Sequence, residues 1–355
     1  MHRSHLSASL AAAFAVFTAV PAHAQTAPAS SVTVYGLFDA VVRRANNVVA
    51  TDRGATITSM EDGLITGTRL GFRGNEALGA GWRASFVMES GFDPSNGTSL
   101  QGTATADYGQ AQANPRFWGR EVNVSLASPW AGVTLGRQYT TAHQIAARFQ
   151  PQGNPNNTAL SVYSSHHIAR QDNVARVGSK LGDFEVMASH TFGEVSDSSA
   201  NGSWSLGSVY AKPDYAVGAY VQEMKNLAGT EERRIIGLGG NYRINPILAL
   251  YGGYMERSSK VSPQENKVWG LGANIELAQP VTLSLQYFDD KQTGSAALDG
   301  SRKVAWVSAN YKFSRRTDVY VTVDQNKVEG GYTRPAFMAA LGTQTVFNVG
   351  LRTRF

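Results

Sequence analysis

Charged residues recur at every second position of several short segments, with apolar residues between them. Arg69 and Arg73 alternate with Leu70 and Phe72 in this way. Successive side chains of an extended strand point to opposite faces, so the guanidinium groups share one face and the apolar side chains share the other. Fixed charges on one face of a strand set up an electrostatic field, and this is the chemistry that the pattern offers.

Residue combinations suited to catalysis or metal binding are not evident. His166 and His167 are adjacent but have no acidic residue close to them in the sequence, and neighbouring side chains of an extended chain point apart. The chain has no cysteine and no G-x-S-x-G motif. Gly237 and Gly270 each begin a G-L-G triplet, but the third glycine of a dinucleotide-binding loop is lacking. We therefore expect no enzyme, no cofactor and no metal site.

The N-terminal residues have the pattern of a secretory signal peptide. Basic residues within positions 2–5 precede an apolar run over residues 10–20, and an A-x-A cleavage signal ends at Ala24. The apolar run is too short to anchor the chain in a membrane. We expect residues 1–24 to be removed and residues 25–355 to form one barrel domain.

Composition narrows the class of the exported chain. Without cysteine, it is not stabilised by disulfides. The full sequence has a net charge of +5 and a pI of about 9.3 but no dense Lys/Arg stripe interleaved with aromatics, so nucleic acid is not an expected partner. Mean hydropathy is −0.23, and the mature chain has no apolar run long enough for a transmembrane helix. Mean hydropathy would not detect the strands of a membrane barrel, because apolar and polar residues alternate in them.

Alternating segments are separated by connections of two lengths, which take turns along the chain. Seven connections are short and contain Gly, Pro, Asp or Ser, and eight are longer and polar. Fifteen connections join sixteen strands. An even number of strands places both termini on the side of the short turns, as in bacterial outer-membrane barrels. The sequence therefore predicts an all-β fold, a 16-stranded antiparallel transmembrane β-barrel.

The final strand, residues 344–355, repeats the alternation and ends on an aromatic residue. Phe347, Val349 and Leu351 fall on one face together with Phe355, while Arg352 falls on the other. We expect this strand to pair with the first one, because an open sheet edge in lipid would leave backbone groups without hydrogen bonds.

Six segments carry a resemblance to a known family. They are SVTVYGLFD (31–39), TRLGFRG (68–74), FVMESGF (86–92), GREVNVSL (119–126), VTLGRQY (133–139) and VGLRTRF (349–355). In this order and over the mature chain, the sequence resembles the trimeric general porins of the Gram-negative outer membrane, specifically the beta-proteobacterial type. The resemblance implies a homotrimer, a third loop folded into the pore, and a C-terminal Phe355 that the barrel-assembly machinery recognises as an assembly signal.

Candidate pore residues face the lumen by alternation or lie in the third loop, and Arg120 is added because the resemblance implies a pore position for it. They are Asp39, Arg43, Arg69, Arg73, Arg83, Glu89, Arg120, Arg148 and Arg170. Porins of this family usually place carboxylates on the third loop, opposite wall arginines. Here the loop, residues 142–171, contains no Asp or Glu. Since rings of one charge set ion preference, we expect a basic constriction that prefers anions.

Two arginines break the alternation. Arg120 is in phase with Val122, and Arg137 is in phase with Leu135, so both would face lipid, which is costly for a guanidinium. Either a bulge reverses the facing or the strand meets a neighbouring subunit. The family position of Arg120 places it in the pore. For Arg137 we favour a subunit interface, with Asp93 or Asp107 of the next protomer as partner.

A substrate-specific outer-membrane channel is the alternative reading. It would present a row of aromatic side chains along the lumen, whereas Tyr35, Trp306 and Tyr320 are scattered over distant strands. The expected partners of the chain are outer-membrane lipids and lipopolysaccharide, together with small hydrophilic solutes and anions.

Overall fold

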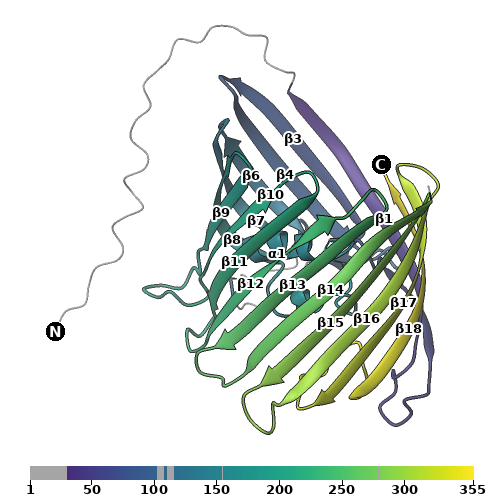
Figure 1. The fold of residues 1–355 in the computed structure, drawn as a ribbon. Helices are drawn as coiled ribbons and strands as arrows, with labels where there is room; N and C mark the ends of the chain where they lie inside the picture. Colours follow the sequence, from purple (N-terminus) through teal and green to yellow (C-terminus); the bar gives the residue numbers. More distant parts are fainter. Residues whose placement is uncertain (1–29, 102–107, 110–115, 154, 279) are drawn as a thin grey trace, which may run out of the picture.

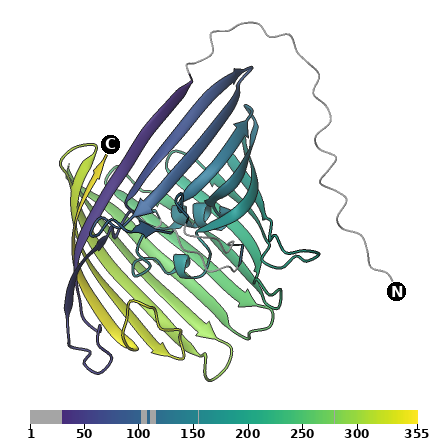
Figure 2. The ribbon, with the colours of Figure 1, turned by 180° about the vertical axis from the view of Figure 1, so that it is seen from behind.

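The structure is a computed structural model that describes residues 30–101, 108–109, 116–153, 155–278 and 280–355. The predicted signal peptide, residues 1–24, therefore lies outside the described residues. Antiparallel strands form one barrel, which Figures 1 and 2 show from opposite sides. Among the described residues, no helix is long and apolar enough to cross a membrane.

Strands account for most of the described chain. Their bounds are β1 (Ser31–Ala45), β2 (Ile57–Asp62), β3 (Arg69–Gly79), β4 (Trp82–Phe92), β5 (Ser99–Leu100), β6 (Glu121–Ala127), β7 (Ala131–Tyr139), β8 (Arg170–Leu181), β9 (Phe184–Thr191), β10 (Ser203–Ala211), β11 (Tyr215–Lys225), β12 (Glu232–Arg243), β13 (Leu248–Ser259), β14 (Glu265–Ala278), β15 (Val281–Thr293), β16 (Gly300–Lys312), β17 (Thr317–Gly330) and β18 (Gly342–Arg354).

The eighteen strands form sixteen spanning strands, because two of the spanning strands are each interrupted and consist of two segments. β2 and β3 pair in succession with the same strand, β1. β5 and β6 likewise both pair with β4. The predicted number of spanning strands is confirmed, and the two series of short and long connections alternate as expected. The first half of the interrupted second spanning strand is β2, which ends directly before Gly63.

The first and last strands close the barrel. β1 pairs with β18 from Leu37 opposite Arg354 to Ala45 opposite Val346. The backbone of Phe355 then exchanges hydrogen bonds with Gly36, at 3.1 and 3.2 Å. The predicted seam is confirmed, and it leaves no open edge in the sheet.

The two faces of the wall have opposite chemistry, because strand residues alternate between them. Outward-facing Leu238, Leu271 and Leu351 are 54–60% exposed, whereas inward-facing Gln222 and Asn348 are fully buried. A soluble sheet would bury the leucines instead. An apolar outer surface and a polar interior are what a lipid bilayer around a water-filled barrel requires.

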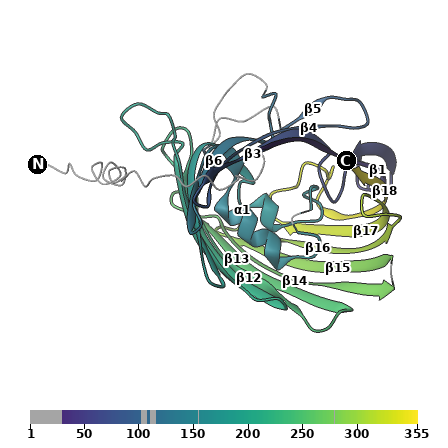
Figure 3. The same ribbon diagram turned by 90° about the horizontal axis from the view of Figure 1, so that it is seen from above.

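The apolar core lies inside the barrel, where the third loop packs. This loop joins β7 to β8 and contains α1 (Thr141–Ala146) and the 3₁₀ turns η1 (Ala147–Phe149) and η2 (Tyr163–Ser165). Figure 3, a view from above, shows α1 within the ring of strands. Ile145 and Phe149 pack in a buried cluster with wall side chains. A Cβ at Gly207 would lie 2.3 Å from Ile145, so glycine in the wall makes room for the loop.

Candidate pore constriction

The third loop crosses the interior and is fastened on its far side. Three wall side chains donate to its backbone there. Arg302 Nη2 donates to the carbonyl of Thr158 at 2.7 Å, and Trp306 Nε1 donates to that of Leu160 at 2.9 Å. Asn326 Nδ2 donates to the carbonyl of Ala159 at 3.0 Å. These bonds hold the far part of the loop against the wall, so the loop is a fixed narrowing of the barrel.

A second inward segment, residues 63–68 between β2 and β3, meets the third loop. The backbone N–H of Asn156 donates to the carbonyl of Ile65 at 3.0 Å. Asp39 holds this segment from the wall, because its carboxylate accepts hydrogen bonds from the Thr66 backbone at 3.0 Å and from Tyr320 Oη at 2.7 Å. The sequence analysis missed this element. Its only sequence signal is Gly63 and Gly67 on either side of Leu64 and Ile65.

Glu89 on β4 is the centre of a charged cluster on the inner wall. Arg120 Nε lies 2.6 Å from its Oε1 atom, and Arg69 Nη1 lies 3.6 Å from the same atom. Tyr35 Oη donates to Oε2 at 2.9 Å, and the guanidinium of Arg73 lies 5.1 Å from the Tyr35 ring centre. Three side chains, from β1, from β3 and from the turn before β6, therefore converge on one carboxylate, and Arg73 of β3 adds a further positive charge beside them.

Tyr139, at the end of β7, joins this cluster to the start of β8. Its hydroxyl accepts from Arg120 Nη2 at 2.9 Å and from Arg170 Nη2, and the Arg170 guanidinium lies 4.1 Å from the ring centre. Arg176 Nη1 donates to its carbonyl at 3.3 Å. The Tyr139 ring also stacks on the ring of His143 in the third loop, so Tyr139 faces the interior of the barrel and not the membrane.

Positive charge dominates this wall of the barrel. The arginines on it are Arg69, Arg73, Arg120, Arg170 and Arg176, and the carboxylates are Glu89 and Glu121. Glu121 was missed, although it alternates in phase with Asn123 and Ser125. The third loop opposite contributes no acid.

Two histidines of the third loop, His143 and His167, do not add to this positive charge at neutral pH. Burial and the neighbouring His166 lower the pKa of His167 to about 3. Burial, His167 and the nearby arginines hold the pKa of His143 well below its usual range. The two rings contact each other, with Nδ1 of His143 3.0 Å from Nε2 of His167. Both imidazoles are therefore neutral, and the arginines alone supply the cations here.

The other predicted pore residues lie away from the cluster. Arg43 is buried and pairs with Glu61 at 2.7 Å. Arg148 pairs with Glu185 at 2.6 Å, with both side chains about one-third exposed. Arg83 is exposed near the short-turn end of β4. Asp39 faces inward but is completely buried beneath residues 63–68, so it is a structural anchor.

The two out-of-phase arginines have local explanations. Arg120 precedes β6, which begins only at Glu121, so the strand alternation does not extend to it. Its side chain is 2% exposed and reaches Glu89 inside the barrel. For Arg137, the β7–β8 pairing shifts register between Gly136 and Gln138, and Gly136 has a φ of +117°. This is a β-bulge, in which glycine tolerates the backbone angle.

The expected partner of Arg137 is wrong. Its Nη1 atom lies 2.9 Å from Oδ1 of Asp172 in the same chain, and its Nε donates to the carbonyl of Gly119 at 2.8 Å. Asp93 instead accepts from the backbone of its own turn, at Ser95, and Asp107 lies outside the described residues. The bulge brings β7 and the irregular start of β8 together. The alternation of residues along a strand cannot predict a contact of this kind. The location of Arg137 at a subunit interface stays a prediction.

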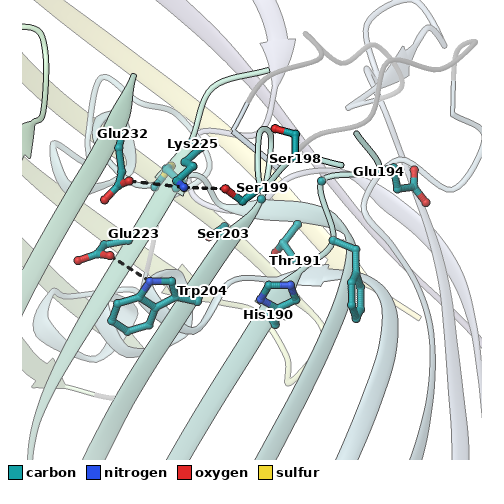
Figure 4. Close-up of a pocket in the computed structure, with 14 residues that line it drawn as sticks. His190, Thr191, Glu194, Ser198, Ser199, Ser203, Trp204, Glu223, Lys225 and Glu232 are labelled. Carbon is teal, nitrogen blue, oxygen red and sulfur yellow. Dashed lines mark hydrogen bonds and ion pairs between the residues drawn. The ribbon is translucent and has the colours of Figure 1, made fainter. Parts of the chain in front are cut away.

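A cavity of ≈ 720 Å³ is separate from the Glu89 cluster (Figure 4). It lies on the outward-facing side of β9–β12, where Trp204 is 42% exposed and donates from Nε1 to Glu223 at 3.0 Å. Loop residues such as Ser199 border it. Across the part of the chain that the structure describes, no group of three or more His, Cys, Asp or Glu side chains could hold a metal ion.

Comparisons with known proteins agree with this geometry. A sequence model described as Gram-negative porin matches residues 9–331. An outer membrane porin of Bordetella pertussis is 26% identical, over the whole length of both chains. An anion-selective porin from Comamonas acidovorans has a similar fold, with a TM-score of 0.74, 22% identity, and coverage of 92% of this chain and 100% of that one. OmpT of Vibrio cholerae in its trimer form has a TM-score of 0.66 at 14% identity, covering 92% and 100% of the two chains.

Proposed function

The chain belongs to the Gram-negative porin family and is a β-barrel diffusion channel of the outer membrane; from this premise we propose that its constriction prefers anions. One observation carries the proposal. Five arginines and two glutamates line the wall opposite a third loop that has no carboxylate. A narrow aqueous passage between low-dielectric walls focuses such a field, so the excess positive charge raises the local concentration of anions.

The residues have distinct roles in this proposal. Arg69, Arg73, Arg120 and Arg170 supply the field of the constriction, and Glu89 reduces it and fixes the guanidinium groups in place. Three further arginines act outside this cluster. Arg83 faces water near the short-turn mouth, and Arg43 and Arg148 are each neutralised by a carboxylate, so their contributions to selectivity are smaller. The ion pairs of Arg43 and Arg148 stabilise the packing inside the barrel.

Substrate-specific transport is the competing function, and the positions of the aromatic residues disfavour it. Tyr320 is 1% exposed and Trp306 is 2% exposed, both covered by inward segments. The hydroxyl of Tyr35 is engaged by Glu89. A sugar path needs a row of accessible rings, and these side chains do not offer one. Liposome swelling with neutral sugars of graded size should therefore show a size cutoff without stereoselectivity.

A homotrimer in a lipopolysaccharide-containing membrane is proposed as the working assembly. Family membership supports it, as does the trimer form described for the OmpT neighbour. Small hydrophilic solutes are the proposed cargo, and Phe355 is proposed as the signal that the barrel-assembly machinery reads. Unheated gel electrophoresis of the purified porin should give a trimer band, and a monomer band in mild detergent would contradict this assembly.

Anion preference is tested by the reversal potential in a KCl gradient across planar bilayers. The wild-type channel should give the sign expected for chloride permeation. Arg69→Gln should reduce the chloride-to-potassium permeability ratio by about twofold, which corresponds to one unit charge roughly 10 Å from the ion path, screened by salt and acting on the two ions in opposite directions. Arg234→Gln removes the same charge from the outer face and serves as the control. A wild-type reversal potential of the cation-selective sign would refute the proposal.

A further inference from the structure

A second basic region lies at the long-loop end of the barrel interior, away from the Glu89 cluster. It surrounds a cavity of ≈ 390 Å³. Arg257 and Gln292 line it from the wall, His166 from the third loop, and Arg334 from the eighth loop, residues 331–341. A cavity of this size can hold a small organic molecule.

Arg257 is the unsatisfied cation of this cavity. By alternation its side chain points inward beside that of Met255, which is fully buried. Its Nε atom is buried and has no hydrogen-bond partner among the described residues, and its Nη2 makes one long contact, 3.4 Å, with Gln264 Oε1. Arg257 is half-buried and makes no ion pair with a carboxylate among the described residues, so an anion is the complement that this position favours.

Two further arginines strengthen the field. Arg334 is exposed on the eighth loop, and its guanidinium makes one contact of 3.5 Å, with the carbonyl of Pro335. Arg302 is 2% exposed, and its donors are taken by Asn326 and by the third loop, including Ser165 Oγ at 3.0 Å. Arg302 therefore contributes only its charge to the cavity, whereas Arg257 and Arg334 have guanidinium N–H groups available to a ligand.

The carboxylate nearest to the cavity is already occupied. Asp290 is fully buried. His166 Nε2 lies 2.6 Å from its Oδ2 atom, and Tyr332 Oη donates to the same oxygen at 2.5 Å. Asn266 Nδ2 donates to Oδ1 at 3.0 Å. These bonds direct Asp290 to the third and eighth loops, so it does not serve as the hydrogen-bonded partner of Arg257.

We propose that this cavity binds the oxyanion group, a carboxylate or a phosphate, of a small solute, whose oxygens accept hydrogen bonds from Arg257 and Arg334. The site would gather anionic solutes at the long-loop mouth before they reach the constriction. It rests on the proposed anion preference but is separable from it, since the two sets of arginines lie on different strands. Guanidinium groups suit both oxyanions because their donors match paired oxygens.

Inorganic phosphate is the probe that tests the site. The full porin is reconstituted in planar bilayers in 0.1 M KCl, where the screening length is about 10 Å. Phosphate is added to the long-loop side, against additions of KCl matched in ionic strength. We expect a saturable decrease of the chloride current. A current that stays as high after phosphate as after the matched KCl additions would overturn the proposal.

Variants assign the effect to residues. Arg257→Gln should raise the half-blocking phosphate concentration at least about tenfold, because a charge-assisted hydrogen bond is lost. Residue 334 is on an exposed loop, so Arg334→Gln tests the site without changing a side chain of the barrel wall. Arg234→Gln, on the outer face of β12, should leave the phosphate effect unchanged. Equal shifts in all three variants, or none in the first two, would refute the site.

The reversal potential in a KCl gradient is recorded on the same membranes. It reports the constriction, so a channel that prefers chloride but ignores phosphate rejects this site and leaves the proposed function standing. A cation-selective channel that still binds phosphate through Arg257 would reject the proposed function and retain the site. The two failures are therefore distinguishable.

Discussion

Glu89 and Asp39 are both carboxylates on the inner face of the wall, but their surroundings differ. Glu89 lies among guanidinium groups and is bonded to Arg120 and Tyr35. Asp39 is covered by residues 63–68 and accepts hydrogen bonds from Tyr320 and Thr66. A carboxylate influences permeating ions when it is near the water path, and it stabilises the fold when it saturates buried donors.

The two carboxylates should therefore respond differently to neutralisation. Glu89→Gln should raise the chloride-to-potassium permeability ratio by about twofold, because one negative charge near the path is removed. Asp39→Asn should leave that ratio unchanged but lower the stability of the barrel by about 1–3 kcal/mol, since a buried donor loses its acceptor. Reversal potentials and the temperature at which the folded gel band is lost provide the two readouts.

Arg120 loses its ion pair in the Glu89 variant, so that variant is also expected to unfold at a lower temperature. Selectivity is compared only between channels that retain the folded gel mobility. A shift of the permeability ratio in Asp39→Asn, or none in Glu89→Gln, would contradict the distinction between an ion-path charge and a structural charge.

At the scale of elements, irregularities in the strands position the charged side chains. The bulge at the end of β7 allows Arg137 to reach Asp172, and the break between β2 and β3 allows residues 63–68 to enter the barrel. Regular strands would have directed Arg137 to lipid and left the interior wider. Bulges that redirect a side chain near a functional site are a recurrent device of β-proteins.

Gly136 is the residue that makes the bulge in β7 possible. Its φ is +117°, and a Cβ would lie 2.4 Å from the carbonyl oxygen of Val122. Gly136→Ala should therefore destabilise the barrel by about 1–3 kcal/mol, the cost of a strained backbone position. The measurement is the conversion temperature of the folded gel band.

Gly178 on β8 is the matched control for this substitution. A Cβ there would meet its nearest atom at 3.7 Å, and its φ is not in the left-handed region. Gly178→Ala should leave the conversion temperature nearly unchanged. Equal conversion temperatures for the two variants would show that the bulge does not depend on glycine at position 136.

At the scale of the whole molecule, closure depends on the pairing of the two chain ends. β1 and β18 are separated by almost the entire sequence, yet their pairing completes the hydrogen bonding of the sheet. The Phe355 ring occupies the space beside Gly36, where a Cβ would lie 2.2 Å from the ring. It also lies 6.2 Å from the ring of Phe38. The last residue therefore packs across the seam.

Deletion of Phe355 should reduce the amount of folded porin in the outer membrane by about tenfold while leaving export intact. Both the packing across the seam and the proposed assembly signal are lost. The packing alone contributes about 1.5–3 kcal/mol to the stability of the barrel. Membrane fractionation and unheated gels measure this. Phe313→Ala removes an aromatic residue that is 65% exposed and does not lie at the seam, so it is the control. Normal folded levels of the truncated chain would contradict the role of Phe355.

The amino-acid sequence by itself determined the class of fold, the number of strands, the seam and the lack of acid in the third loop. A period of two decides which face a strand residue occupies, and it places Arg69, Arg73 and Glu89 inside on this basis alone. Composition is equally visible without coordinates, so a basic constriction could be expected.

Only the tertiary structure decided which of these charges act together. The face of the strand on which a residue lies does not specify how deeply its side chain is buried or which residue it contacts. Asp39 and Glu89 therefore look equivalent in sequence, although Asp39 is buried in contact with Tyr320, 281 positions away. Loops and bulges have no periodicity to read. The partner of Arg137, the inward turn at residues 63–68 and the cavity beside Arg257 therefore follow from long-range packing, which brings together segments that no local pattern connects.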